Sequence, residues 1–275
     1  MRIAVYQART GIDPQVNART LADRIAEASS AGARMIFTPE MSGLLDRDRQ
    51  RAKPHLREEA EDPVLRAVRD AARAHGIWVH LGSLALKDPA AGDRLVNRGF
   101  VVDDEGAIRA RYEKMHLFDV DLATGESWRE SAAYAPGQRS VLASTPIGRL
   151  GLSICYDIRF PDLYRSLTNA GAQILSIPAA FTVPTGEAHW HVLLRARAIE
   201  AGVFVVAAAQ AGQHEDGRTT YGHSLVVDPW GEILLDMGSD EGLGYADLDL
   251  ERVDQVRSRL PAIRHRREIG RPELL

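Results

Sequence analysis

The sequence predicts an α/β fold: a four-layer sandwich, helix–sheet–sheet–helix, made of two duplicated halves. Short β-branched runs alternate with longer amphipathic runs, which is typical of α/β proteins. The order of these runs in residues 2–112 returns in residues 149–236. With 45% hydrophobic and 26% charged residues, the composition is that of an average globular protein, which excludes disordered and fibrous classes.

Hydrophobic periodicity gives the elements of the first half. Apolar runs or runs of period two predict strands, and a period near 3.6 residues predicts helices. In chain order, the predicted elements are a strand at 2–8, a helix at 16–31, a strand at 34–39, a helix at 63–75, and strands at 77–86, 98–103 and 107–112.

The second half gives the same order of elements. They are a strand at 149–155, a helix at 160–171, a strand at 173–178, a helix at 188–201, and strands at 203–211, 223–228 and 232–236. The repeat extends to single residues, because a helix end, a glycine, a buried strand and a proline occur in both 31–39 and 170–178. Two such halves would bury their bare sheet faces against each other. The alternative is that any two α/β halves look alike.

Residues 113–148 do not fit the repeat and predict a loop-rich insert. Long loops in a compact domain are usually functional or disordered. No low-complexity linker separates the two halves. We therefore expect residues 1–275 to form one domain.

Charge and hydropathy exclude several classes of partner. The chain has 34 Lys and Arg against 38 Asp and Glu, a net charge of −4, which argues against binding to nucleic acid. The longest apolar run, 201–209, is far shorter than the roughly 18 residues of a membrane span. The N-terminus does not resemble an export signal. These patterns predict a soluble cytoplasmic protein that binds neither nucleic acid nor membranes.

The single cysteine, Cys155, is a candidate nucleophile. It ends an apolar strand and precedes a turn that leads through Pro161 and Asp162 into a helix. Backbone N–H groups at such a position favour a thiolate and can stabilise an oxyanion. The alternative is a buried structural cysteine, the commoner role of a lone cysteine.

Glu40 and Lys114 are candidates for the same site. Pro39 stops the early strand and turns Glu40 out at its carboxyl end, the edge at which open α/β sheets bind ligands. A carboxylate near a thiol can act as its general base. Lys114 lies among apolar neighbours, and a packed ammonium can stabilise a tetrahedral intermediate. The alternatives are a solvated loop glutamate and a surface lysine.

The histidines give no ligand set with metal-site spacing, so we expect no metal. His189 and His191 are two residues apart, which places them on different faces of a helix. A Cys–His hydrolase is an alternative, but the spacing does not select among His116, His189 and His223 as its base. Neither a phosphate-binding Gly-Lys loop, nor Gly-x-Gly-x-x-Gly, nor Gly-x-Ser-x-Gly occurs.

Three segments together resemble the Glu–Lys–Cys motifs of the nitrilase superfamily of carbon–nitrogen hydrolases. They are Pro39-Glu40, Lys114 within Tyr-Glu-Lys-Met-His-Leu-Phe-Asp, and Cys155 within Ser-Ile-Cys-Tyr-Asp-Ile-Arg-Phe-Pro. Their order and spacing match the family. The resemblance covers nearly the whole chain, including 186–190, 195–200, 222–224 and 228–231.

The resemblance implies a four-layer αββα sandwich and a role for each motif residue. Cys155 would be the nucleophile, Glu40 the general base and Lys114 the oxyanion stabiliser. A second glutamate helps position the lysine and the water in many members. Glu130 lies where it would fall, with Glu126 as a nearby alternative.

The resemblance also implies a substrate class. The chain is similar to the Nit amidase branch, whose members hydrolyse α-ketoglutaramate or its peptide conjugate, deaminated glutathione. Residues 207–214 and 221–224 resemble the deaminated glutathione amidases more closely than the ω-amidases. Two alternatives stay open: an ω-amidase or another aliphatic amidase, and a non-catalytic interaction module of the same fold.

An acyl group with a carboxylate and a keto oxygen needs a cation and hydrogen-bond donors. Arg159, four residues after the nucleophile, is the candidate cation, and its alternative role is a structural pair with Asp157 or Asp162. The remaining candidates for substrate binding are Tyr156, Thr182, Thr185 and Tyr221. The resemblance implies no cofactor, and it implies a homodimer or a larger oligomer paired through a helical face.

Overall fold

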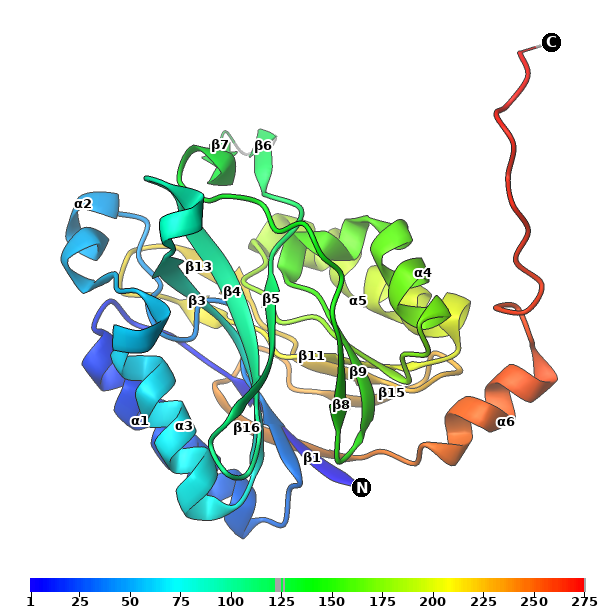
Figure 1. Ribbon diagram of the computed structural model, residues 1–275, viewed down its shortest axis with the longest axis horizontal. Coiled ribbons are helices and arrows are strands. Elements are labelled where there is room, and N and C mark those ends of the chain that lie inside the picture. The colour runs from blue at the N-terminus through cyan, green and yellow to red at the C-terminus, as the bar shows by residue number, and fades with distance from the viewer. Residues whose placement is uncertain (122–124, 126, 275) are drawn as a thin grey trace.

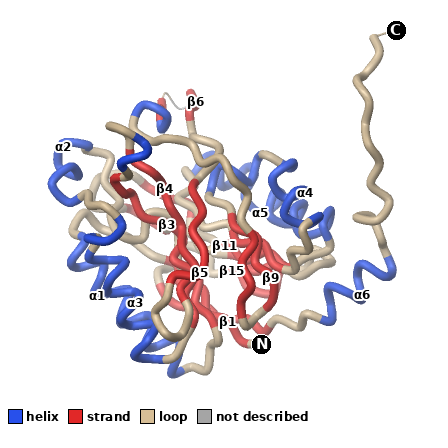
Figure 2. The backbone as a smooth tube through the Cα atoms, in the orientation of Figure 1, coloured by secondary structure: helices blue, strands red, loops and turns tan. Residues whose placement is uncertain are grey.

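The computed structural model describes residues 1–121, 125 and 127–274. Strands occupy its centre and helices lie outside them (Figure 2). The first half contains β1 (Arg2–Gln7), α1 (Pro14–Ser30), β2 (Met35–Phe37), α2 (Arg49–Ala52), α3 (Pro63–His75), β3 (Trp78–Lys87), β4 (Leu95–Val102) and β5 (Ile108–Glu113). The insert contains β6 (Asp119–Asp121), β7 (Ser127–Arg129) and β8 (Leu142–Thr145).

The second half and the C-terminal segment complete the fold. They contain β9 (Gly148–Leu152), α4 (Pro161–Asn169), β10 (Ile174–Ser176), α5 (Val183–Ala201), β11 (Phe204–Ala207), β12 (Ala211–Gln213), β13 (Thr219–Tyr221), β14 (Leu225–Val227), β15 (Ile233–Asp236), β16 (Gly242–Asp247) and α6 (Glu251–Arg259). Of the helices that the structure describes, none has both the length and the apolar character of a membrane span.

Two six-stranded sheets with the same strand order form the two middle layers. The first runs β16-β1-β2-β3-β4-β5 and the second β8-β9-β10-β11-β14-β15. In each sheet the three strands after the first are parallel to one another, and the remaining neighbours pair antiparallel. In Figure 1, α1 and α3 lie beside the first sheet, and α4 and α5 lie beside the second. The predicted four-layer sandwich is confirmed.

Alternation along β1 shows how the layers pack. Ile3 and Val5 are buried in the larger apolar core, which includes residues of the second sheet. Ala4 and Tyr6 point the other way, into the core that α1 and α3 form with the first sheet. A strand that is covered on both faces must be apolar throughout, and this explains the continuous apolar run near the N-terminus.

Local sequence signals fix the helix ends. Asp62 caps α3 by accepting a hydrogen bond from the Leu65 backbone N–H at 2.8 Å, and Pro63 occupies the first turn. Gly76 ends the same helix with φ of 61°, a conformation that glycine adopts without steric cost. The predicted helix at 63–75 is therefore correct at both ends.

Several predicted boundaries differ from the structure. The helix predicted at 188–201 begins earlier, at Val183, because Pro184 fits its first turn. The strand predicted at 149–155 stops at Leu152, and Cys155 instead begins a short 3₁₀ helix. The strand predicted at 203–211 is divided between β11 and β12. The edge strands β8 and β16 and the helix α6 were not predicted.

Candidate active site

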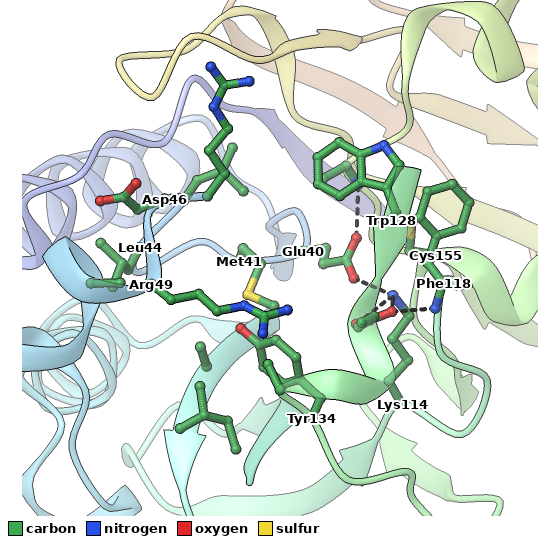
Figure 3. A pocket seen from close by; sticks show the side chains of 18 of the residues that line it. Glu40, Met41, Leu44, Asp46, Arg49, Lys114, Phe118, Trp128, Tyr134 and Cys155 are labelled. Carbon is green, nitrogen blue, oxygen red and sulfur yellow. Dashed lines mark hydrogen bonds and ion pairs between the residues drawn. The ribbon is translucent and has the colours of Figure 1, made fainter. Parts of the chain in front are cut away.

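Three chain segments bring Glu40, Lys114 and Cys155 to one place (Figure 3). Glu40 lies three residues beyond β2, Lys114 directly follows β5, and Cys155 is the first residue of the 3₁₀ helix Cys155–Arg159 after β9. All three are buried. The structure thus brings together, from both halves of the chain, the three residues that the sequence analysis singled out.

Lys114 lies between two carboxylates. Its Nζ donates to Glu40 Oε1 at 2.9 Å and to Glu130 Oε1 and Oε2 at 3.1 and 2.9 Å. Burial alone would lower the pKa of Lys114, but the charges of Glu130 and Glu40 outweigh it and hold that pKa well above its usual range. Lys114 therefore stays a cation while buried.

Glu130 joins the group from the insert. It begins the 3₁₀ helix Glu130–Ala132, and its Oε2 accepts from the Phe118 backbone N–H at 2.6 Å. Of the two glutamates considered for this position, Glu130 contacts Lys114, whereas Glu126 lies outside the described residues.

The backbone places the Cys155 thiol beside Glu40. Cys155 has φ of 49°, in the left-handed region that a non-glycine residue rarely adopts, and its N–H donates to Pro178 O at 2.8 Å. Burial, together with the charge of Glu40, raises the pKa of the thiol well above its usual range, although Lys114 acts to lower it. The resting residue is a neutral thiol beside a carboxylate that can accept its proton.

A buried aspartate holds the turn that carries the nucleophile. Asp157 Oδ2 accepts from the Ile154 backbone N–H at 2.9 Å and from the Tyr112 hydroxyl at 2.6 Å. Its Oδ1 accepts from the His116 backbone N–H at 3.0 Å and lies 2.7 Å from His116 Nδ1. Asp157 thus ties the Cys155 turn to the segment that carries Lys114.

The catalytic candidates line a cavity of about 1250 Å³. Tyr156, Thr182 and Thr185 also line it, as the sequence analysis expected of substrate-binding residues. The Thr182 and Thr185 hydroxyl oxygens lie 2.8 Å apart at the start of α5. Cationic side chains other than Lys114 line the cavity too: Arg47, Arg49, Lys53, Lys87, Arg94, Arg129 and Arg218.

Arg159 and Tyr221 lie behind this lining. The Arg159 guanidinium lies over the rings of Tyr156 and Phe181, at 5.9 and 5.7 Å from their centroids, and its Nη2 is 3.3 Å from His189 Nδ1. The Tyr221 ring stacks on His223, with 4.5 Å between the ring centroids. Neither residue is among the described residues that line the cavity.

Sequence reasoning missed several residues of the site. Asn97, buried in β4, donates through Nδ2 to Glu40 Oε1 at 3.0 Å and to Glu130 Oε1 at 3.4 Å. A buried amide in a strand needs a hydrogen-bond partner, so a polar residue among the apolar positions of β4 is a weak signal that could have identified it. Arg49, on the short helix α2, extends toward Tyr134 (Figure 3). No pattern in the sequence indicates that Arg49 and Tyr134 line the same cavity.

Comparisons with known proteins agree with this geometry. The carbon–nitrogen hydrolase family model matches residues 2–258. The chain is 36% identical to a deaminated glutathione amidase of Yersinia enterocolitica, over 98% of this chain and 93% of that protein. It is 41% identical to the deaminated glutathione amidase of Homo sapiens, over 96% of this chain and 82% of that protein.

Solved structures show the same relationship. The Caenorhabditis elegans NitFhit protein superposes with a TM-score of 0.89 and 40% identity over 97% of this chain, which spans 65% of that protein. An amidase from Nesterenkonia, in a mutant that carries acrylamide added at its active-site cysteine, gives a TM-score of 0.78 and 29% identity, covering 95% of this chain and 98% of that one.

The extent of these matches decides the family. The family model and both relatives cover nearly the whole chain, and the two relatives are 36% and 41% identical to it. This chain belongs to the carbon–nitrogen hydrolase family of the nitrilase superfamily, and it is a hydrolase that acts on amides.

Proposed function

We propose that the chain hydrolyses a linear amide through a thioester on Cys155, with Glu40 as general base and Lys114 as oxyanion stabiliser. The observation that carries this proposal is the buried ion-paired group of Glu40, Lys114 and Glu130 beside Cys155 at the cavity. The relative from Nesterenkonia is an amidase with an active-site cysteine, which supports the assignment of the nucleophile.

In the first half of the reaction, Glu40 takes the thiol proton while Cys155 attacks the amide carbon. Lys114 Nζ and the Tyr156 backbone N–H stabilise the charge that develops on the carbonyl oxygen. Glu40 then gives the proton to the departing nitrogen, and a thioester remains on Cys155. The raised pKa of the thiol fits this sequence, because a neutral thiol needs an adjacent base.

In the second half, Glu40 removes a proton from water, which attacks the thioester. Collapse of the tetrahedral intermediate releases the acid and returns the proton to Cys155. Glu130 keeps Lys114 in place through both halves, because both of its carboxylate oxygens accept from the ammonium.

We propose deaminated glutathione as the substrate, cleaved to α-ketoglutarate and cysteinylglycine. This molecule carries a carboxylate at each end, whereas α-ketoglutaramate carries one. The cavity is large and is lined by several cations, and Arg47 and Arg49 form no ion pair within the part of the chain that the structure describes. The names of the relatives from Yersinia enterocolitica and Homo sapiens support the same choice.

Separate incubation with deaminated glutathione and with α-ketoglutaramate tests the substrate. Both yield α-ketoglutarate, so one assay gives kcat/KM for each. We expect the peptide conjugate to be preferred. Preference for the simple amide would make the chain an ω-amidase, and turnover of neither substrate would contradict both assignments.

We propose that Arg159 supports substrate binding indirectly, by holding the rings of Tyr156 and Phe181, which line the cavity. We expect Arg159→Met to raise KM for a 2-oxo dicarboxylic monoamide. Arg73→Met, on the outside of α3, serves as the control. An unchanged KM would remove Arg159 from substrate binding.

We also propose that the chain forms a homodimer through the face that α5 and the β14–β15 hairpin share. Val192 and Trp230 are 69% and 52% exposed there, and Ile199, Ile233 and Leu234 are also exposed. Residues 261–274 extend away from the body and could reach a second copy (Figure 1). Light scattering on the purified protein tests this, and Val192→Glu is expected to yield monomers.

A further inference from the structure

The structure brings two histidines and an aspartate together on the outer side of the second half. His191 lies on α5, His223 follows β13, and Asp236 ends β15. One potential ligand atom from each residue lies within 4.8 Å of the others. These positions are 32 and 13 residues apart in the chain, so sequence spacing could not identify the group.

The ligand atoms already face one another. His191 Nε2 is 3.0 Å from Asp236 Oδ2, and His223 Nδ1 is 2.8 Å from Asp236 Oδ1. Ligands at about 2.0–2.1 Å from a tetrahedral ion are separated by roughly 3.3 Å, so both nitrogen–oxygen distances are close to those of an occupied site. The three side chains are 28–32% exposed in the single chain, which leaves access for the ion and for water as a further ligand. Because His191 and Asp236 belong to the elements of the proposed dimer face, light scattering is to accompany the Zn²⁺ titration, and ion binding is expected in the oligomeric state found.

The surrounding contacts fix the group in place. The His223 N–H donates to Gly238 O at 2.6 Å, and the His223 carbonyl accepts from Nε1 of the buried Trp190 at 2.8 Å. The Gly238 N–H in turn donates to Asp236 Oδ1 at 3.0 Å. His223 also has φ of 54°, an unusual backbone conformation that these contacts maintain. Such supporting contacts hold metal ligands in their binding orientation.

We propose that His191, His223 and Asp236 form a binding site for a divalent transition-metal ion, with Zn²⁺ as the representative. Two imidazole nitrogens and one carboxylate suit Zn²⁺ or Co²⁺, whereas Mg²⁺ and Ca²⁺ prefer oxygen ligands alone. The site is separate from the amidase cavity and does not depend on the proposed substrate.

A bound ion joins three elements that are far apart in sequence. Residues at the start of α5, Val183 to Thr185, line the amidase cavity, as do Thr219 and Thr220 of β13. The ion therefore holds one wall of that cavity from outside. We expect Zn²⁺ to raise the Tm of the protein by binding the folded chain.

The test is Zn²⁺ titration of the untagged, chelator-treated full chain by calorimetry, followed by Co²⁺ absorption spectroscopy. We expect one ion per chain, a Co²⁺ spectrum without a thiolate-to-metal band, and no comparable binding of Mg²⁺. His191→Gln should weaken Zn²⁺ affinity at least about tenfold, since loss even of outer contacts to a metal ligand costs 10–100-fold. It should also abolish the rise in Tm.

Two controls make the result decisive. His75→Gln, an exposed histidine at the end of α3, and Cys155→Ala should both bind Zn²⁺ as the unmodified chain does. Asp236→Asn, which keeps the side-chain shape, should weaken binding as His191→Gln does and guards against misfolding of the histidine variant. Absence of binding, unchanged affinity in both cluster variants, or loss of binding in Cys155→Ala would each overturn the proposal.

Discussion

The two halves have the same sheet topology but contribute different chemistry. Ile3 pairs with Met35 in the first sheet as Leu150 pairs with Ile174 in the second, so the strands correspond residue by residue. By this register, the first-half counterpart of Cys155 is Ala8.

The second-half counterpart of Glu40, like Ala8, has a side chain without a reactive group. Counting from the same register, it is Ala179, and both Ala8 and Ala179 are buried. The adjoining Ala180 contributes only its backbone N–H, which donates to Glu40 Oε2 at 3.0 Å. Duplication thus accounts for the frame of the molecule, whereas the reacting groups lie at non-equivalent positions. The base comes from the first half, the lysine from the start of the insert and the nucleophile from the second half.

The largest expected effect is loss of the nucleophile. Cys155→Ala should abolish turnover, because no thioester can form, while circular dichroism and the Tm stay close to those of the unmodified chain. Adding Ala8→Cys to this variant should restore nothing, since Glu40 and Lys114 do not face the equivalent position. Measurable turnover by Cys155→Ala would contradict the covalent mechanism. Restored turnover in the double variant would contradict the claim that the two halves contribute different reacting groups.

Lys114→Met should come next in severity. Removal of one oxyanion donor costs about 10²–10³ in kcat in other hydrolases. The variant also leaves Glu40 and Glu130 buried without their cation, and breaking a buried pair costs about 3–5 kcal/mol of unfolding free energy. Single-turnover rates and urea titration measure the two effects separately. Normal acylation in a folded variant would exclude Lys114 from the site.

Asn97→Ala should have an intermediate effect, since Asn97 positions both glutamates without reaching the thiol. Hydrogen bonds to charged groups contribute about 1.5–3 kcal/mol, so kcat should fall roughly ten- to a hundredfold. A positioning role predicts that kcat falls while KM changes little. Asn169→Ala, at the end of α4, is the surface control, and an unchanged kcat in Asn97→Ala would show that the glutamates hold their places without it.

The smallest effect concerns pH. The pKa of Cys155 is raised in the folded chain from its ordinary value of 9.0, so the folded state resists deprotonation more than the unfolded one. Its stabilising contribution is complete below pH 9 and is lost as pH rises toward the folded pKa. The urea concentration at the midpoint of unfolding should therefore decrease as the pH rises above 9. The decrease should be smaller in Cys155→Ala, which lacks the thiol. Parallel curves for the two proteins would contradict the raised pKa.

The sequence predicted the repeated strands well because a strand covered on both faces is apolar where it is buried, as residues 3–6 of β1 and Phe204–Ala207 of β11 are. It could not predict β16, whose alternation is weak and whose partner β1 lies at the other end of the chain. It singled out Glu40, Lys114 and Cys155 through their motifs. Asn97 was missed because only tertiary packing brings it to Glu40 and Glu130, and Arg49 because only packing brings it to the cavity.

The pairing of β1 with β16 has a consequence for synthesis of the chain. β1 is synthesised long before its antiparallel neighbour β16, from which most of the fold separates it in the sequence. At about 5–20 residues per second, the outer edge of β1 stays unpaired during most of translation. An unpaired apolar edge invites aggregation. Nascent chains that stall just before Gly242 should therefore be clients for chaperones, even though all residues of the candidate catalytic site have already been made.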